Sequence, residues 1–394
     1  MTALAGIRVL DFGRYIAGPY CAAMLADFGA EVIRIEKREG SEDRYVAPVT
    51  PDGEGALFMQ MNRNKRSLTL DPMSDEGREV VRRLVRTADV VIVNMPPSAV
   101  TAMGLDHETL TQLKPDIISV HLSAFGDAGP WQERLGFDTV GQTMCGSVHM
   151  TGEPDQPYRA QIAWVDFATA LHAAYGVMVA LYSRRDTGKG QKVTGALLAS
   201  AIALNSAALI EQAMIAPNRL ASGNRGQSSG PTDLFRTLDG WIVCHVIGAP
   251  LFKRWARLMG DADVWLADPR FVDDATRGEN SEVLTARMAE WCSGKTREEA
   301  LDALAAAKLP AGPVLTPQEA LDHPQVNALG LLQQVAYPGH SKPMPLASIP
   351  VFLSGTPGTI RSAAPVLGQD ADPILAELGY DPAAIVALRD AGIV

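Results

Sequence analysis

Short apolar runs alternate with longer amphipathic stretches through the first third of the chain. The apolar runs indicate buried strands at residues 7–12, 31–36, 89–94 and 116–123. The stretches between them indicate helices at residues 18–29, 74–88 and 106–114. Because strands and helices alternate with short connections, we expect an α/β fold whose parallel sheet is covered by helices on both faces.

The pattern changes in the second half of the chain. Two Ala-rich helices are expected between residues 163 and 215, joined by the charged turn YSRRDTGKGQKVT. Gly, Ser and Asn then concentrate, and beyond them a β-hairpin at residues 234–247 and helices at residues 250–259, 281–293 and 296–306 indicate an α+β domain. We therefore expect a large Rossmann-like domain, a linker, a small α+β domain, and a return linker with C-terminal helices packing on the large domain, at residues 1–216, 217–232, 233–330 and 331–394.

Charge and cysteine usage narrow the partners and the compartment. The net charge of −10 disfavours a general nucleic-acid surface. The cysteines show no CxxC or metal-ligand spacing, so we expect buried thiols in a reducing compartment. The N-terminus runs directly into a strand, without a signal-like pattern, and the apolar runs near 167–182 and 195–210 are rich in small residues. These observations predict core helices and a cytoplasmic protein without a membrane partner.

Three segments could bind an anion. Lys37 and Arg38 follow the second strand, at the edge where open α/β sheets bind ligands. The segment NMPPSAV begins at Asn94 and opens a helix whose first N–H groups are free. The third segment is a basic cluster of Arg63, Lys65 and Arg66. Each could instead be a solvated basic loop, and the chain has neither GxGxxG nor GxxxxGK[ST], so NAD and NTP chemistry are not expected.

Asp166 is the candidate for covalent chemistry. It stands at the head of a nearly uncharged helix, where an aspartate is most simply an N-cap. A carboxylate in that place is also favoured by the helix dipole and can attack an activated acyl group. No GxSxG motif occurs, the histidines are scattered, and Asp11 inside the first strand is expected to be structural. The residues alone leave both interpretations of Asp166 open.

Several long motifs resemble those of the class III CoA-transferases, a family that includes formyl-CoA and carnitine CoA-transferases and the α-methylacyl-CoA racemases. They are LAGIRVLDFGRYIAGPYCAAMLADFGAEVIRIEK, NRNKRSLTLD, ADVVIVNMPP, GFDTVGQTMCG, DFATALHAAYGVMVALYSRRDTGKGQKV and LGQDADPILAELGY. The resemblance spans essentially the whole chain. It implies an interlocked homodimer that uses CoA, acyl-CoA and a small carboxylic acid as substrates, with no metal and no permanently bound cofactor.

The resemblance also implies roles for individual residues. Asp166 matches the family's nucleophile, which forms a mixed anhydride with the acyl group and then an enzyme–CoA thioester. The positions matching CoA contacts are Ile16, Ala17, Lys37, Arg38, Leu70, Asp71, Pro72, Met73, Asn94, Met95, Pro96, Arg134 and Phe137. Two departures stand out: Ala102 replaces a family arginine, and GNRGQSSGPTD does not match the glycine-rich mobile loop of formyl-CoA transferase. The second departure disfavours formate and oxalate as the substrate pair.

Two alternatives to an intermolecular CoA-transferase remain. The first is an α-methylacyl-CoA racemase or an intramolecular acyl-CoA isomerase on the same fold. A racemase on this fold needs two acid–base groups, one of which is the histidine of a GHD segment. Here that segment reads GFD, with Phe137 in the histidine's place and His149 and His172 as the nearest replacements in sequence. The other alternative is a non-catalytic CoA-binding protein in which Asp166 only caps its helix.

Overall fold

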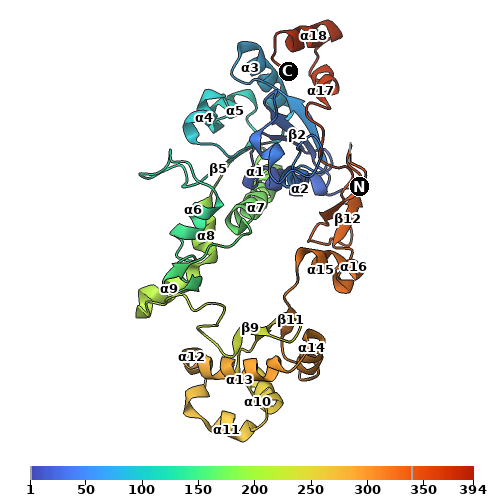
Figure 1. The fold of residues 1–394 in the computed structure, drawn as a ribbon. Coiled ribbons are helices and arrows are strands. Elements are labelled where there is room, and N and C mark those ends of the chain that lie inside the picture. Colours follow the sequence, from blue (N-terminus) through green and yellow to red (C-terminus); the bar gives the residue numbers. More distant parts are fainter. Residues whose placement is uncertain (1, 339) are drawn as a thin grey trace. The chain divides into compact units, whose positions relative to one another are not determined.

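The computed structural model of the protein describes residues 2–338 and 340–394, which form two compact units. The larger unit comprises Met1–Cys145, Ala160–Ala213 and Pro324–Val394, and the smaller one Gly146–Arg159 and Met214–His323. Figure 1 shows the chain coloured along its sequence, with blue, green and red segments meeting in the larger unit. The larger unit is therefore built from both ends of the chain.

A six-stranded parallel sheet forms the centre of the larger unit, in the order β3-β2-β1-β4-β5-β8. The strands are β1 (Arg8–Asp11), β2 (Glu31–Glu36), β3 (Lys65–Thr69), β4 (Val90–Val93), β5 (Ile118–Ser123) and β8 (Lys192–Ala196). The α/β fold and the four strands expected from the apolar runs are confirmed. The sequence pattern missed β3 and β8, because β3 begins with two cations and β8 lies inside a charged turn.

Alternate residues of the central strands β1 and β4 face two separate cores. Leu10 and Val91 belong to the core that includes α3 (Asp75–Thr87), α17 (Ala371–Glu377) and α18 (Pro382–Asp390). Val9 and Val90 belong to the opposite core, which includes α1 (Ala17–Asp27) and α7 (Trp164–Thr187). This alternation places helices on both faces of the sheet.

Shorter elements complete the larger unit. They are η1 (Glu42–Tyr45), α2 (Ala56–Met61), α4 (Pro97–Ala102), α5 (His107–Leu113), α6 (Asp138–Met144), α8 (Leu197–Leu204), α9 (Ser206–Ile215), α16 (Pro324–Ala328), β12 (Leu332–Val335) and β13 (Met344–Ala347). The last residues of α9 fall in the smaller unit, which starts again at Met214. β12 and β13 pair as an antiparallel hairpin in the segment that the sequence pattern assigned to a return linker.

The smaller unit has a core of its own. Its elements are β6 (Gly152–Glu153), β7 (Gln156–Pro157), β9 (Thr232–Arg236), β10 (Trp241–His245), β11 (Ala311–Pro313), α10 (Ala249–Met259), α11 (Ala262–Ala267), η2 (Pro269–Phe271), α12 (Asp274–Glu279), α13 (Ser281–Ser293), α14 (Arg297–Ala306) and α15 (Pro317–Asp322). The hairpin β9–β10 extends to β11 as an antiparallel sheet, and Phe235 and Trp255 pack between it and the helices. The expected hairpin and helices of an α+β unit are present.

Helix α7 has two different apolar faces. Small residues, such as Ala170 and Ala173, are buried against α1, which they allow to approach closely. The other face exposes the large side chains of Leu171, Tyr175, Met178, Val179 and Tyr182. The expectation of a core helix therefore holds for only one face. By length and composition α7 could cross a membrane, as could α8 and α9 if their pair, bent by 64°, were one span.

Candidate active site

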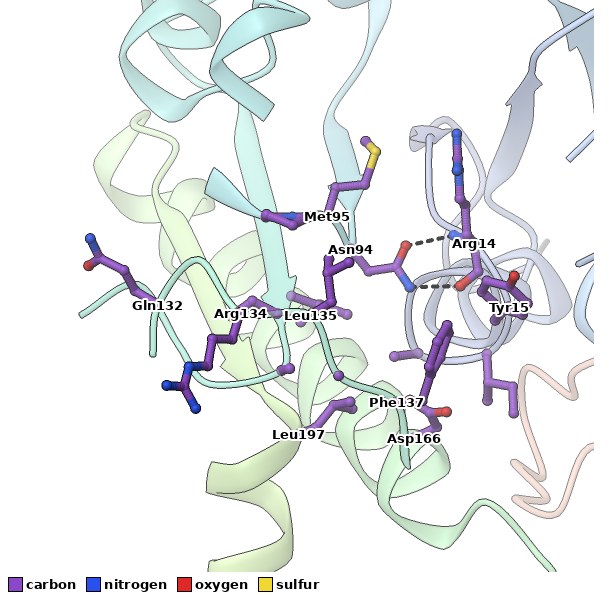
Figure 2. A pocket seen from close by; sticks show the side chains of 17 residues that line it. Arg14, Tyr15, Asn94, Met95, Gln132, Arg134, Leu135, Phe137, Asp166 and Leu197 are labelled. Carbon is purple, nitrogen blue, oxygen red and sulfur yellow. Dashed lines mark hydrogen bonds between the residues drawn. The ribbon is translucent and has the colours of Figure 1, made fainter. Parts of the chain in front are cut away.

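A cavity of about 210 Å³ lies at the carboxyl ends of β1, β4 and β5, entirely within the larger unit. Loops after these strands and the first turn of α7 line it. It brings together eight residues expected at the site, namely Ile16, Ala17, Asn94, Met95, Pro96, Arg134, Phe137 and Asp166. Figure 2 shows Asp166 and Phe137 among the side chains that line it.

Asp166 is not the cap of its helix. It is the third residue of α7, and the N-cap position belongs to Ala163, whose side chain makes no capping bond. The cap comes from Asp138, whose Oδ1 accepts the N–H groups of Val165 at 2.7 Å and Asp166 at 3.1 Å. The N-cap interpretation of Asp166 is therefore wrong, because Asp138 satisfies the N–H groups that a cap would bind.

The capping carboxylate is itself fixed. Gln142, one turn further along α6, donates from Nε2 to the second oxygen of Asp138. Its Oε1 accepts the N–H of Ala160 at 2.9 Å, just before α7. Asp138 and Gln142 therefore hold the start of α7 at two points and fix the part of the helix from which the Asp166 side chain projects.

The carboxylate of Asp166 is buried and unpaired. Its residue is 9% exposed, and no described residue forms a hydrogen bond or ion pair with this carboxylate. Burial, together with the smaller effect of the nearby charge of Asp138, raises the pKa of Asp166 to about 7. A more basic carboxylate is a stronger nucleophile, and one with this pKa is still substantially ionised at neutral pH.

Asn94 fixes the loop between β1 and α1. Its Oδ1 accepts the N–H of Arg14 at 2.6 Å, and its Nδ2 donates to the carbonyl of Arg14 at 2.7 Å (Figure 2). The next residue, Tyr15, has the left-handed φ of 60° and meets Phe137 edge-on at 5.2 Å between ring centroids. Asn94 thus lines the cavity, while its side-chain amide is hydrogen-bonded to the backbone of the neighbouring loop.

Three cations lie on or beside the cavity wall. Arg14 and Arg134 line it, and the Arg134 guanidinium lies 4.1 Å from the ring centroid of Trp131. Lys37 lies outside the lining, but its Nζ is 2.6 Å from Glu42, which is 3.5 Å from Arg14. The sequence analysis missed Arg14 and Tyr15, although a cation in the loop after the first strand was a usable signal.

The segment after β3 also lies outside the cavity. Leu70 is fully buried, and its N–H donates to the carbonyl of Glu36. The N–H of Asp71 donates to Ile393, while Met73 is half exposed. The segment 70–73 and the exposed Arg38 follow β3 and β2, whose carboxyl ends lie at the same edge of the sheet as the cavity.

The basic cluster of the third predicted anion segment is occupied by internal ion pairs. Arg63 pairs with Asp27, Lys65 with Asp11, and Arg66 with Glu31 and Glu377, at N–O distances of 2.5 to 2.9 Å. Arg63 and Lys65 are buried. The expectation of an anion site here is wrong, because the side chains face carboxylates of the fold rather than solvent.

The described residues that line the cavity include no histidine. Phe137 occupies the place of the racemase histidine, and the ring of His172, further along α7, contacts Ser200 at 3.1 Å. His149 belongs to the smaller unit. The described residues also contain no group of three or more His, Cys, Asp and Glu side chains arranged to hold a metal ion.

The sequence model of CoA-transferase family III matches residues 4–371. The chain belongs to CoA-transferase family III. This confirms the resemblance carried by the sequence motifs. The protein moves CoA from an acyl-CoA thioester to a carboxylic acid, and CoA thioesters are its substrates.

Individual relatives of this family III CoA-transferase support the assignment over the whole chain. It is 33% identical to succinyl-CoA–D-citramalate CoA-transferase of Chloroflexus aurantiacus, over 95% of this chain and 94% of the relative. It is 31% identical to formyl-CoA:oxalate CoA-transferase of Rhodopseudomonas palustris, over 99% and 97% of the two chains. A solved CaiB/BaiF family protein from Brucella suis superposes with a TM-score of 0.84 and 32% identity, over 96% and 99% of the chains.

Proposed function

We propose that this CoA-transferase carries the acyl group and CoA in turn on Asp166. The observation that supports this role is the buried carboxylate at the cavity, which has no hydrogen-bond partner among the described residues while Asp138 caps the helix. A nucleophile in this place needs a free lone pair, a raised basicity and shelter from water. Asp166 has all three.

The reaction proceeds in four balanced steps. The Asp166 carboxylate attacks the thioester carbonyl, the C–S bond breaks, and CoA leaves as a thiolate while the acyl group stays on Asp166 as a mixed anhydride. The thiolate attacks the aspartyl carbonyl and expels the first acid as its carboxylate, leaving an aspartyl–CoA thioester. The second acid attacks this thioester and displaces the thiolate, which then attacks the new acyl carbonyl. The second acyl-CoA leaves and Asp166 returns to its carboxylate.

The start of α1 is suited to stabilise the oxyanions of these steps. Ile16 and Ala17 line the cavity, and Ala17 is the first residue of the helix. The first N–H groups of a helix have no partner inside it and lie at the positive end of the helix dipole. The Ala17 N–H is therefore our candidate donor for the developing negative charge.

We also propose that Lys37, beside Arg14, contacts the CoA phosphates. Lys37→Ala should raise the Kd for CoA, and the loss should shrink as salt is added because the contact is electrostatic. The matched control is Lys114→Ala, since Lys114 also lies 2.6 Å from a carboxylate but precedes β5, at the opposite edge of the sheet. Equal losses in both variants, measured by titration calorimetry, would place the phosphates elsewhere.

The transferase is favoured over a racemase by Phe137, which lines the cavity in the histidine's place and cannot exchange a proton. Incubation of a 2-methylacyl-CoA in D2O should leave the α-carbon undeuterated, while CoA moves to an added acid. The acids tested should include succinate, citramalate, formate and oxalate, and mass spectrometry reads both outcomes. Enzyme-dependent α-deuteration without transfer would establish the racemase, and acyl-CoA binding with neither reaction would indicate a non-catalytic protein.

The exposed apolar side chains favour a homodimer, in which a second copy of the chain covers them. Large apolar side chains are exposed on the outer face of α7, and Ile210, Met214 and Ile215 are exposed on α9, a helix with no buried residue. Such a surface is usually covered in the working protein. Sedimentation should give twice the chain mass of 42.1 kDa, and a monomer would contradict the proposal.

The cytoplasm is the compartment that we propose. The fold is a soluble type of α/β structure, and the four cysteines are buried thiols outside any disulfide. Buried free thiols and CoA thioester chemistry both fit a reducing compartment. Cell fractionation tests this assignment.

A further inference from the structure

The loop between β1 and α1 is held in an unfavourable conformation. Tyr15 has a φ of 60°, a region that residues with side chains rarely occupy unless the surrounding structure imposes it. Arg14, Tyr15, Ile16 and Ala17 all line the cavity, so the shape of the acyl-CoA site depends on this loop. Something in the fold must therefore hold both of its ends.

A buried ion pair does so. Lys65 Nζ donates to Asp11 Oδ2 at 2.7 Å and to the carbonyl of Pro19, beyond the loop, at 2.8 Å. Asp11 Oδ1 accepts the N–H of Gly13, where the loop begins, at 2.9 Å. A third bond, to Asn62 Oδ1 at 2.8 Å, completes the donor capacity of Lys65. Both ends of the loop are therefore bonded to one ion pair.

The packing leaves the loop little freedom while this pair is intact. A Cβ atom on Gly13 would lie 2.8 Å from Asp11 Oδ1 and 2.8 Å from Pro19 Cδ. The side chains of Asp11 and Lys65 are completely buried. A buried ion pair is not in itself an efficient source of stability, because desolvation offsets its attraction. Its geometric effect on the loop is the more specific consequence.

We propose that Asp11 and Lys65 are positioning residues, a loop clamp that holds Tyr15 and its neighbours in the conformation that binds acyl-CoA. Neither side chain lines the cavity, and both act through the backbone at Gly13 and Pro19. This inference rests on the cavity being the acyl-CoA site. Lys65, which the sequence placed in an anion-binding segment, would therefore affect ligand binding through the loop backbone rather than by contacting the ligand.

The surroundings of the clamp make it sensitive to alkaline pH. The pKa of Lys65 is lowered to about 8, chiefly by burial. The charge of Asp11 opposes this lowering, Arg34 from β2 adds to it, and Asp43 from η1 opposes it. Cys21 from α1 also faces the pair, and burial raises the pKa of its thiol. Above this pH Lys65 loses its charge and holds Asp11 less firmly. Because the pKa is lower in the folded state, this deprotonation does not itself favour unfolding.

The test compares Lys65→Met, the charge-balanced double variant Asp11→Asn/Lys65→Met and Arg63→Met. Arg63 is a matched control because it is a buried cation from the same segment, paired with Asp27 at 2.6 Å. The probe is a non-reactive CoA thioether, whose Kd is measured from about pH 7 to about pH 9.5. Turnover with acyl-CoA gives KM and kcat separately, and circular dichroism checks folding.

Loss of the clamp should raise the Kd and KM by about tenfold or more, with a smaller change in kcat. In the wild type and Arg63→Met the Kd should rise above about pH 8, and in the double variant this rise should be absent. A folded double variant that binds within about twofold of the wild type would overturn the proposal. If both Lys65 variants fail to fold, a wild-type Kd that stays flat over this pH range would overturn it. Failure of the wild type to bind the thioether would instead contradict the acyl-CoA site itself.

Discussion

Replacing Asp166 by asparagine should abolish CoA transfer and leave the protein folded. The amide has nearly the same shape but cannot form the mixed anhydride, and removal of a covalent nucleophile can cost about 10⁴-fold or more in rate. The helix keeps its cap, because the capping carboxylate belongs to Asp138. Turnover is measured by acyl-CoA exchange, and hydroxylamine trapping during turnover should modify Asp166 in the wild type.

The same variant should be at least as stable as the wild type at alkaline pH. Burial raises the pKa of Asp166 to about 7, so the folded state resists its ionisation, whereas the unfolded chain ionises at ordinary acidic pH. The wild type therefore carries a penalty that grows as pH rises through this interval and is complete above about pH 7. Thermal unfolding at alkaline and acidic pH should show a higher melting temperature for the asparagine variant only at alkaline pH.

Near-normal turnover in the Asp166→Asn variant would contradict the proposal that Asp166 is the nucleophile.

Asp138→Asn should move the acid limb of the pH–rate profile. In the wild type, kcat/KM should fall by about tenfold per pH unit below the pKa of Asp166, because only the ionised carboxylate attacks. Removal of the Asp138 charge should lower that pKa, although burial, its largest cause, remains. The variant should therefore keep a larger share of its activity at acidic pH than the wild type does.

Removing the charge of a capping carboxylate at another helix should not produce this shift. Asp106→Asn is the matched control, since Asp106 caps α5 by accepting the N–H of Thr109 at 3.0 Å and does not line the cavity. Its profile should keep the wild-type midpoint. A midpoint unchanged in Asp138→Asn would mean that the two carboxylates do not interact.

The sequence predicted the central strands because β1, β2, β4 and β5 are short segments rich in Val, Ile and Leu, as strands buried on both faces usually are. It missed β3 because Lys65 looks solvent-exposed in a sequence, whereas the fold supplies Asp11, 54 residues away, as its buried partner. The edge strand β8 has a single large apolar residue, Val193. A charged side chain that is buried by pairing with a residue far away in the sequence does not appear in the periodic pattern of apolar positions.

The candidate site also depends on contacts between residues far apart in the sequence, which the sequence pattern could not show. The family resemblance pointed to Asp166, and the cavity contains it together with seven of the expected CoA contacts. The environment that tunes Asp166 was not predictable, because Asp138 precedes it by 28 residues and meets it only after α6 packs beside α7. Arg14 was missed for a different reason, since it lies in a loop that matched no recognised anion motif.

The order in which this chain leaves the ribosome has a consequence for its synthesis. The core of the smaller unit uses residues between 235 and 309 only, so it can form while the chain is still growing. The larger unit cannot complete one of the two cores beside its sheet until Ile374, Leu375, Ile393 and Val394 have been translated. Until then, Leu10, Leu84 and Val91 remain an incompletely covered apolar surface. A premature stop near the end of the message would therefore leave the nascent enzyme exposed to chaperones and proteases, although every catalytic residue had already been made.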